Sequence, residues 1–228
     1  MRISVVTCGR NDGYEGNWLE RFERFLASIP RDFELVMVEY NPPPDRPLLQ
    51  DLYRDRATFY QVPAEFHNTL PNSNIMPIHD STAKNIGIRR ALGQYIVTTN
   101  VGVMFSHDLN LYLRYGEISR GAVYTAKRHD LDEQEKTTTI HDWAPGDLTL
   151  MHRDNWWLLR GYAEGYTFGH WDSYTVERAQ AMGLEKILLP HAVYHLHHTR
   201  AQHAVRPWTP MPDPGNLNTD QWGSPWLK

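Results

Sequence analysis

The chain has 228 residues, of which 41% are hydrophobic and 22% are charged, a balance typical of a folded globular protein rather than a disordered one. The formal net charge of -4 means that basic residues are not in excess, which argues against a general nucleic-acid-binding protein. Cys8 is the single cysteine, so a disulfide framework and a cysteine-based zinc site are excluded.

The N-terminal segment enters a strand pattern directly. It lacks the long apolar run and the small-residue cleavage site of a signal peptide. No window of the sequence is long and apolar enough to span a bilayer. We therefore expect a cytoplasmic protein without an integral membrane segment.

The first hundred residues alternate between strand and helix patterns. Runs of Val, Ile and aromatic residues predict strands, and apolar residues at helical spacing predict helices. The expected strands are 2–7, 33–40, 57–63 and 94–100. The expected helices are 17–29, a short helix between residues 47 and 57, and 79–93. Asp80 or Ser81 is the expected N-cap of the second helix, and Gly93 is its expected C-cap. This alternation implies a single α/β domain, Rossmann-like, with a mainly parallel central sheet and helices on both faces.

The second half is more varied. It predicts a strand at 121–127, a strand at 147–152, helices at 153–161 and 170–183, and two short apolar runs at 186–190 and 192–198. The polar segment 128–146 is expected to be a long mobile loop. Residues 207–228 are rich in Pro, Gly and Asn, so we expect an irregular tail, which is a candidate cover for the active site.

The strand over 94–100 ends in an unusual break, Asn100-Val101-Gly102. In sheets of this kind, ligands bind beyond the carboxyl ends of the strands. The loops after Thr7, Tyr40 and Thr99 are therefore expected to converge, and the break lies where a ligand should bind.

Six segments occur in a characteristic order: "ISVVTCGRND", "LVMVEYNPPPDRP", "STAKNIGIRRALGQYIVTTN", "GDLTLMHRDNWWLLRGYAE", "HWDSYTVERAQAMG" and "YHLHH". Together they resemble the GT-A-fold glycosyltransferases, specifically the large group similar to family-two enzymes. The resemblance runs over most of residues 3–198. It implies a GT-A domain over 1–206, with a nucleotide-binding half at 1–105 and an acceptor and catalytic half at 106–206.

The resemblance implies a nucleotide-sugar donor, usually a UDP- or GDP-sugar, at the carboxyl ends of the first strands. Thr7 and Arg10 lie at the first loop, and Glu39 ends the second strand, where a carboxylate accepts hydrogen bonds from a base or from ribose hydroxyls. Lys84 and Asn85 match a Lys-Asn or Arg-Asn pair of the family, whose cation pairs with phosphate or holds the base. A solvated side chain is the alternative for Glu39 and for Lys84.

The family places its metal motif at the end of the fourth strand, where an acidic pair, or Asn followed two residues later by Asp, binds Mn²⁺ or Mg²⁺ and the diphosphate. Asn100 and Gly102 hold that place here, and neither is an anionic oxygen ligand. His195 and His198 match a region where related enzymes carry a metal-binding histidine, with a structural hydrogen bond as the alternative. Three hypotheses stay open: a metal bound through other groups, cationic side chains in place of the metal, or no catalysis.

Asp172 matches the carboxylate that deprotonates the acceptor hydroxyl in inverting enzymes of this fold. A first-turn carboxylate stabilised by the helix dipole is the alternative, and both roles are compatible. Gly146 and Asp147 match the segment that contacts the donor sugar or the acceptor. The further candidates for the same cleft are Glu164, His170 and Trp171.

The expected function is therefore transfer of a sugar from a nucleotide-diphosphate sugar to a hydroxyl acceptor such as a glycan. The alternative, suggested by Gly102, is a non-catalytic GT-A-like protein that binds a nucleotide-sugar or a glycan. A nucleotidyltransferase is disfavoured because no glycine-rich phosphate loop with a following lysine occurs near the N-terminus.

Overall fold

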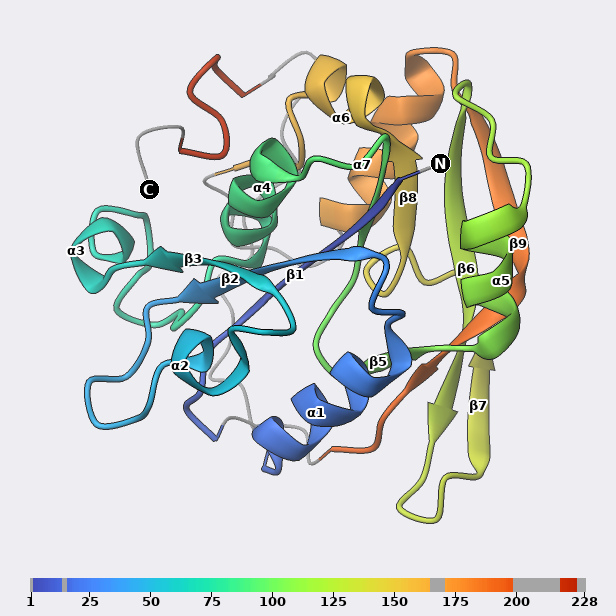
Figure 1. The fold of residues 1–228 in the computed structure, drawn as a ribbon. Helices are drawn as coiled ribbons and strands as arrows, with labels where there is room; N and C mark the ends of the chain where they lie inside the picture. Colours follow the sequence, from blue (N-terminus) through green and yellow to red (C-terminus); the bar gives the residue numbers. More distant parts are fainter. Residues whose placement is uncertain (1, 14–15, 165–170, 199–217, 225–228) are drawn as a thin grey trace.

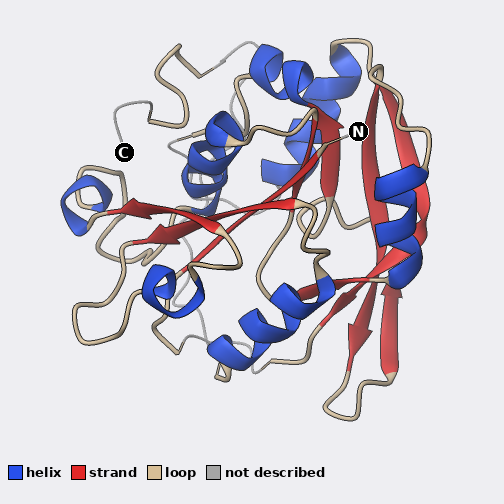
Figure 2. Cartoon of the chain, viewed as in Figure 1, coloured by secondary structure: helices blue, strands red, loops and turns tan. Residues whose placement is uncertain are grey.

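Nine strands form one sheet in the part of the chain that the computed structural model describes, residues 2–13, 16–164, 171–198 and 218–224 (Figures 1 and 2). The strands are β1 (Ile3–Gly9), β2 (Glu34–Tyr40), β3 (Thr58–Val62), β4 (Tyr95–Thr98), β5 (Val103–Phe105), β6 (Ala122–Leu131), β7 (Thr137–His141), β8 (Thr149–His152) and β9 (Glu185–His195). The helices are α1 (Trp18–Ser28), α2 (Leu49–Tyr53), α3 (Ala64–His67), α4 (Asp80–Arg90), α5 (His107–Tyr115), α6 (Arg153–Leu159) and α7 (Trp171–Ala181). None of these helices is long and apolar enough to cross a membrane.

The strand order is β3-β2-β1-β4-β8-β6-β9-β5, with β7 paired to β6. The block β3-β2-β1-β4 is parallel throughout, as the alternating pattern of the first half predicts. β8 runs antiparallel to both β4 and β6, whereas β9 runs parallel to β6. The start of β8 and the ends of β6 and β9 therefore lie at the same edge of the sheet as the carboxyl ends of β1, β2 and β4.

Helices cover both faces of the sheet because successive residues of a strand point to opposite sides. On β1, Val5 packs in a core cluster with side chains of α1 and α5, and Val6 packs in a second cluster with α4, α6 and α7. Both valines are fully buried. Figure 1 shows the same division, with α1 and α5 apart from the group formed by α4, α6 and α7. The expected single-domain α/β architecture is confirmed.

The predicted caps of α4 are wrong. The helix begins after His79, with no side-chain hydrogen bond at this cap, and it ends at Arg90 with Ala91 as its C-cap. Gly93 has a different role: its N–H donates to Ser4 Oγ at 2.7 Å, and a Cβ at position 93 would come within 2.6 Å of the Ser4 backbone nitrogen. This glycine therefore permits a close approach to β1.

The prediction of a loop over 128–146 is also wrong for the first part of this segment, because β6 continues to Leu131 and forms a hairpin with β7. The two apolar runs near the C-terminus form one strand, β9. Its register against β6 shifts between Leu189 and Ala192, where Pro190 interrupts the ladder because it has no N–H to donate. The helix α5 was not predicted; Ser106 caps it by accepting a hydrogen bond from Leu109 N at 3.1 Å.

Candidate functional site

Buried threonines connect the carboxyl ends of β1 and β4. Thr7 Oγ1 donates to the Thr99 carbonyl at 3.2 Å, and Thr99 Oγ1 donates to the Asp147 carbonyl at 2.7 Å. Because β8 runs antiparallel to β4, the segment that leads into β8 arrives beside the end of β4. The topology therefore brings Asp147 next to Asn100.

Lys84 lies at the centre of this edge. Its side chain is fully buried on α4, so the solvated alternative is wrong. Its Nζ donates to Asn100 Oδ1 at 2.7 Å and to the Gly146 carbonyl at 3.4 Å. The Trp171 ring covers the ammonium group, with 4.9 Å between Nζ and the ring centroid. Four sequence-predicted site residues thus meet in direct contact.

Asp172, in the first turn of α7, packs against the α-carbon of Gly146. A Cβ at position 146 would overlap Asp172 Oδ2, so this contact requires glycine. Burial raises the pKa of the Asp172 carboxyl, and the nearby Lys84 charge opposes this shift. A carboxylate with a raised pKa is a stronger base than an exposed one, which suits proton abstraction.

The Asp147 carboxylate is held by two donors. Asn100 Nδ2 donates to Oδ1 at 3.3 Å, and Arg128 Nη1 donates to Oδ2 at 2.9 Å. Arg128 lies in the second half of β6, and its Nε is 2.8 Å from Asp130 Oδ1. The sequence pattern does not indicate Arg128 and Asp130 as site residues, because this part of the chain has the composition of a polar loop.

His195 and His198 lie together at the end of β9, with 5.0 Å between their ring centroids. His195 Nδ1 is 3.8 Å from Asp130 Oδ1, and His141 Nε2 is 2.9 Å from Asp130 Oδ2. Burial lowers the pKa of His195, which favours its neutral form. The Asp130–Arg128–Asp147 chain of ion pairs therefore connects His195 to the Lys84 group.

Glu39 is fully buried at the end of β2, so it is not a solvated strand end. Its Oε1 accepts from the Leu49 backbone N–H at 2.7 Å, at the start of α2, and burial raises its pKa. Arg10 is engaged in the neighbouring loop, where Nη1 donates to the Pro77 carbonyl at 3.1 Å and Nε pairs with Asp12 at 2.9 Å.

Asn85 and Glu164 form a second polar group beside α4. Asn85 Nδ2 donates to the Tyr162 carbonyl at 2.8 Å and to Glu164 Oε1 at 2.9 Å, and its Oδ1 accepts from Tyr162 N at 2.8 Å. Glu164 Oε1 also accepts from Gly223 N at 2.8 Å. These bonds give both side chains partners within the protein. The predicted site residue His170 lies outside the described residues.

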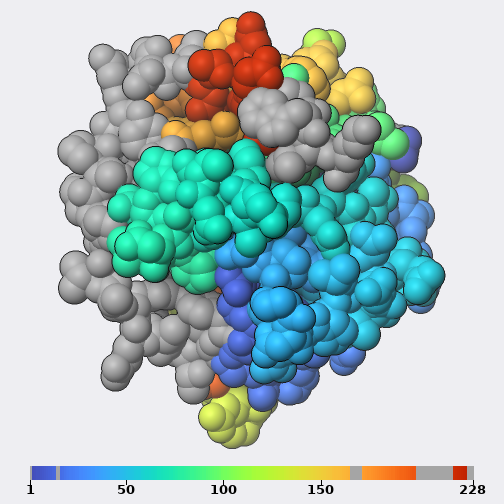
Figure 3. All heavy atoms as spheres, turned by 90° about the vertical axis from the view of Figure 1, so that its left-hand side faces the viewer, coloured from blue at the N-terminus to red at the C-terminus, as the bar shows by residue number. Residues whose placement is uncertain are grey.

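The described part of the tail, residues 218–224, packs beside α4 and α6. The Trp222 ring contacts the Trp157 ring at 5.3 Å between centroids, and the Arg89 guanidinium lies over Trp222 at 5.3 Å. Figure 3 shows this segment in red at the top of the molecule. The tail as a cover for the active site stays a prediction.

The residues at the metal-motif position do not fit a divalent cation. Asn100 Oδ1 already accepts from the Lys84 ammonium group, and Gly102 offers no side-chain ligand. Across the described ranges, no group of three or more His, Cys, Asp or Glu is arranged to hold a metal ion. Hard divalent cations require several anionic or carbonyl oxygens, and the Asp147 carboxylate is paired with Arg128.

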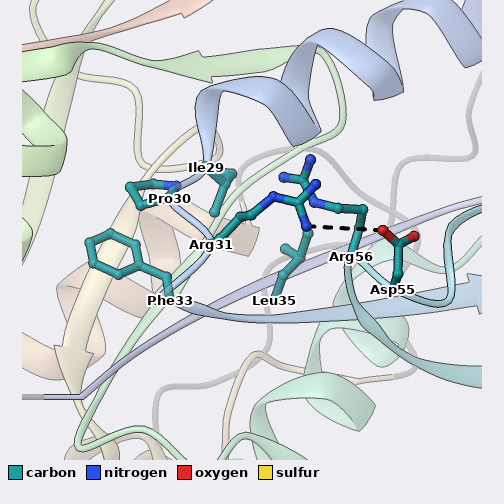
Figure 4. A pocket seen from close by; sticks show the side chains of 7 residues that line it. All are labelled: Ile29, Pro30, Arg31, Phe33, Leu35, Asp55 and Arg56. Carbon is teal, nitrogen blue, oxygen red and sulfur yellow. Dashed lines mark ion pairs between the residues drawn. The ribbon is translucent and has the colours of Figure 1, made fainter.

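A small cavity of about 60 Å³ lies at the opposite, amino-terminal edge of β2 and β3 (Figure 4). Its lining residues are Ile29, Pro30, Arg31, Phe33, Leu35, Asp55 and Arg56. Arg31 and Asp55 face each other across it, with 4.0 Å between Nη1 and Oδ2. The cavity is therefore separate from the predicted site residues.

Comparisons with protein-family models and with curated proteins find no match for this chain. Solved structures do match. The mannosyltransferase PcManGT from Pyrobaculum calidifontis, in complex with GDP-Man and Mn²⁺, is 17% identical with a TM-score of 0.60, and the match covers 88% of this chain. S. aureus TarS 1–349 is 13% identical in complexes with UDP and with UDP-GlcNAc, with TM-scores of 0.59 and 0.58 and coverage of 86% and 89%.

This chain spans only part of those structures, between 58% and 61% of their length. At this level of identity the likeness establishes a shared fold. The GT-A-like α/β fold expected from the sequence is therefore confirmed.

Proposed function

We propose that this chain is a glycosyltransferase that moves a sugar from a nucleotide-diphosphate sugar to a hydroxyl acceptor such as a glycan. This proposal rests on one observation: Asp172, Gly146, Lys84 and Asn100 lie in contact at the carboxyl edge of the parallel strands. The similar structures in complex with GDP-Man and with UDP-GlcNAc support the same donor class.

The site combines the groups that such a transfer needs. Asp172 accepts the proton of the acceptor hydroxyl while the oxygen of that hydroxyl forms a bond to the anomeric carbon of the donor sugar. The bond from that carbon to the diphosphate breaks on the opposite face of the sugar, which inverts the configuration, and the nucleoside diphosphate leaves. In this proposal Asp147 and Asn100, which are hydrogen-bonded to each other, bind sugar hydroxyls.

In this proposal each of the two predicted halves of the chain contributes residues to the site. Residues 1–105 contribute Lys84 and Asn100 for the donor, together with Glu39 at the end of β2. Residues 106–206 contribute Asp147 and Asp172 for the sugar and the acceptor.

A second candidate function is nucleotide-sugar or glycan binding without transfer. Gly102 favours it, because the carboxylate that the metal motif usually supplies is missing. The two functions share the donor site and differ in turnover.

The experiment that tests the proposal measures nucleoside diphosphate released from GDP-mannose or UDP-GlcNAc, with a panel of hydroxyl acceptors. Asp172→Asn should lower the rate by about 10²- to 10⁴-fold, because the general base is lost. Asp108→Asn is the matched control: Asp108 is also a first-turn carboxylate, exposed on α5 at the opposite face of the sheet. It should leave the rate unchanged.

A wild-type rate in Asp172→Asn would contradict the assignment of the base. Donor binding without release of a nucleoside diphosphate would favour the non-catalytic function instead.

A further inference from the structure

Arg21 occupies the space beside Gly102. Arg21 lies on α1 and is 6% exposed, and its Nη1 would be 3.4 Å from a Cβ at position 102. Its Nη2 donates to the Gly16 carbonyl at 3.3 Å. Gly102 has φ +92°, a conformation that disfavours any other residue. A guanidinium group therefore stands where the second residue of the metal motif would extend its carboxylate.

Lys84 lies at the other side of the same turn, and its hydrogen bonds go to neutral oxygens. Its Nζ donates to the Asn100 side-chain oxygen and to the Gly146 carbonyl. No carboxylate among the described residues forms an ion pair with it. The Asp172 carboxyl feels this charge but forms no ion pair with it. Buried charges in proteins are normally paired, so a fully buried ammonium group whose hydrogen-bond acceptors are neutral is suited to an anionic ligand.

The turn at Asn100-Val101-Gly102 is thus bracketed by two cations, Lys84 on α4 and Arg21 on α1. A divalent cation that entered this turn would meet two like charges and no carboxylate of the turn itself. A diphosphate would instead meet these two charges of the opposite sign, in surroundings where screening by water is weak. The Asp147 carboxylate beside Asn100 is itself paired with Arg128.

We propose that the diphosphate of the donor binds here without a divalent metal, with the Lys84 ammonium group as its counter-charge and the Arg21 guanidinium in the place of the metal-motif carboxylate. This inference rests on the proposed function, because it concerns the same donor. The charge that the leaving nucleoside diphosphate develops is then neutralised by protein side chains.

The test measures the dissociation constants of UDP and GDP by titration calorimetry, in excess EDTA and in excess Mn²⁺ or Mg²⁺. The key variant is Asn100→Asp, which keeps the shape of the side chain and places a carboxylate oxygen where Asn100 Oδ1 lies 2.7 Å from Lys84 Nζ. In the proposed site this carboxylate neutralises Lys84, so affinity in EDTA should fall by about 10- to 100-fold. In a metal site the same change would tighten binding with Mn²⁺.

Two further variants complete the test. Lys84→Met should also weaken binding in EDTA by about 10- to 100-fold, with circular dichroism and the melting temperature as checks of folding. Asn155→Asp is the matched control: Asn155 lies on α6 at the amino-terminal edge, where its Nδ2 donates to the Arg120 carbonyl at 2.7 Å. It should leave the affinity unchanged.

Binding in EDTA that Asn100→Asp weakens supports the proposal. Binding that appears only with Mn²⁺ or Mg²⁺, or that Asn100→Asp strengthens with metal, overturns it and leaves the proposed function intact. If neither nucleotide binds with or without metal, the donor site itself is wrong and both proposals fail.

Discussion

Asp172 rests on the α-carbon of Gly146, and this contact makes the position of the proposed base sensitive to a single methyl group. Gly146→Ala places a Cβ where Asp172 Oδ2 now lies. The carboxylate must then move, and a displacement of about 1 Å at a reacting group costs on the order of 10²-fold in rate. We expect a loss of that size in kcat, measured at saturating donor and acceptor.

The control for this prediction is Gly121→Ala. A Cβ at position 121 has its nearest neighbour, Ser119 Oγ, at 3.7 Å, which is an ordinary contact. This variant should keep the wild-type kcat. Equal kcat values in Gly146→Ala and in the wild type would show that Asp172 is not held where the chemistry takes place.

At the residue scale, the sequence identifies the side chains that follow strand ends or begin helices, because a parallel sheet brings those positions to one edge. Lys84, Asn100, Asp147 and Asp172 are predicted for this reason together with the family resemblance, and the structure places them together. Arg21 lies inside an amphipathic helix, where a polar residue ordinarily faces solvent, so only the three-dimensional arrangement reveals its place beside Gly102.

Glu39 joins two elements, since it ends β2 and accepts a hydrogen bond from Leu49 at the start of α2. Burial raises its pKa above the ordinary value of 4.5, so the folded protein binds this proton more tightly than the unfolded chain does. Its contribution to the free energy of unfolding is therefore fully present below pH 4.5 and is lost as the pH rises through the folded-state pKa.

The variant Glu39→Gln keeps a side-chain oxygen for Leu49 N and does not ionise. Relative to the wild type, its free energy of unfolding should increase between mildly acidic and neutral pH, because only the wild type loses stability over that interval. Urea unfolding at both pH values measures this difference. A difference that does not change with pH would show that Glu39 keeps its ordinary pKa in the folded protein.

At the element scale, the strands of the first half are predictable because β1, β2 and β4 are buried on both faces and read as nearly continuous apolar runs. The second half was harder to predict. The hairpin of β6 and β7 carries exposed threonines and charged residues, so its outer part has the composition of a loop. Pro190 divides β9 into two apparent segments, and only its pairing with β6 shows that they are one strand.

At the scale of the whole molecule, the reversal of direction at β8 determines the site. It returns the chain to the carboxyl edge of β4, and β6 and β9 then end at the same edge. Residues from both halves of the chain can therefore contact one donor. The alternation of strand and helix patterns in the sequence predicts the parallel half of this arrangement. No local sequence pattern predicts that β8 runs antiparallel to its neighbours.

Hydrogen exchange with and without a nucleotide-sugar tests the location of the donor site most directly. With UDP-GlcNAc or GDP-mannose present, amides in residues 98–102, 144–149 and 171–175 should exchange more slowly, because these segments form the carboxyl edge. Amides in residues 29–35, beside the cavity at the amino-terminal edge, should exchange at an unchanged rate. Protection at 29–35 without protection at 98–102, or no protection by either donor, would contradict the assignment of this edge as the donor site.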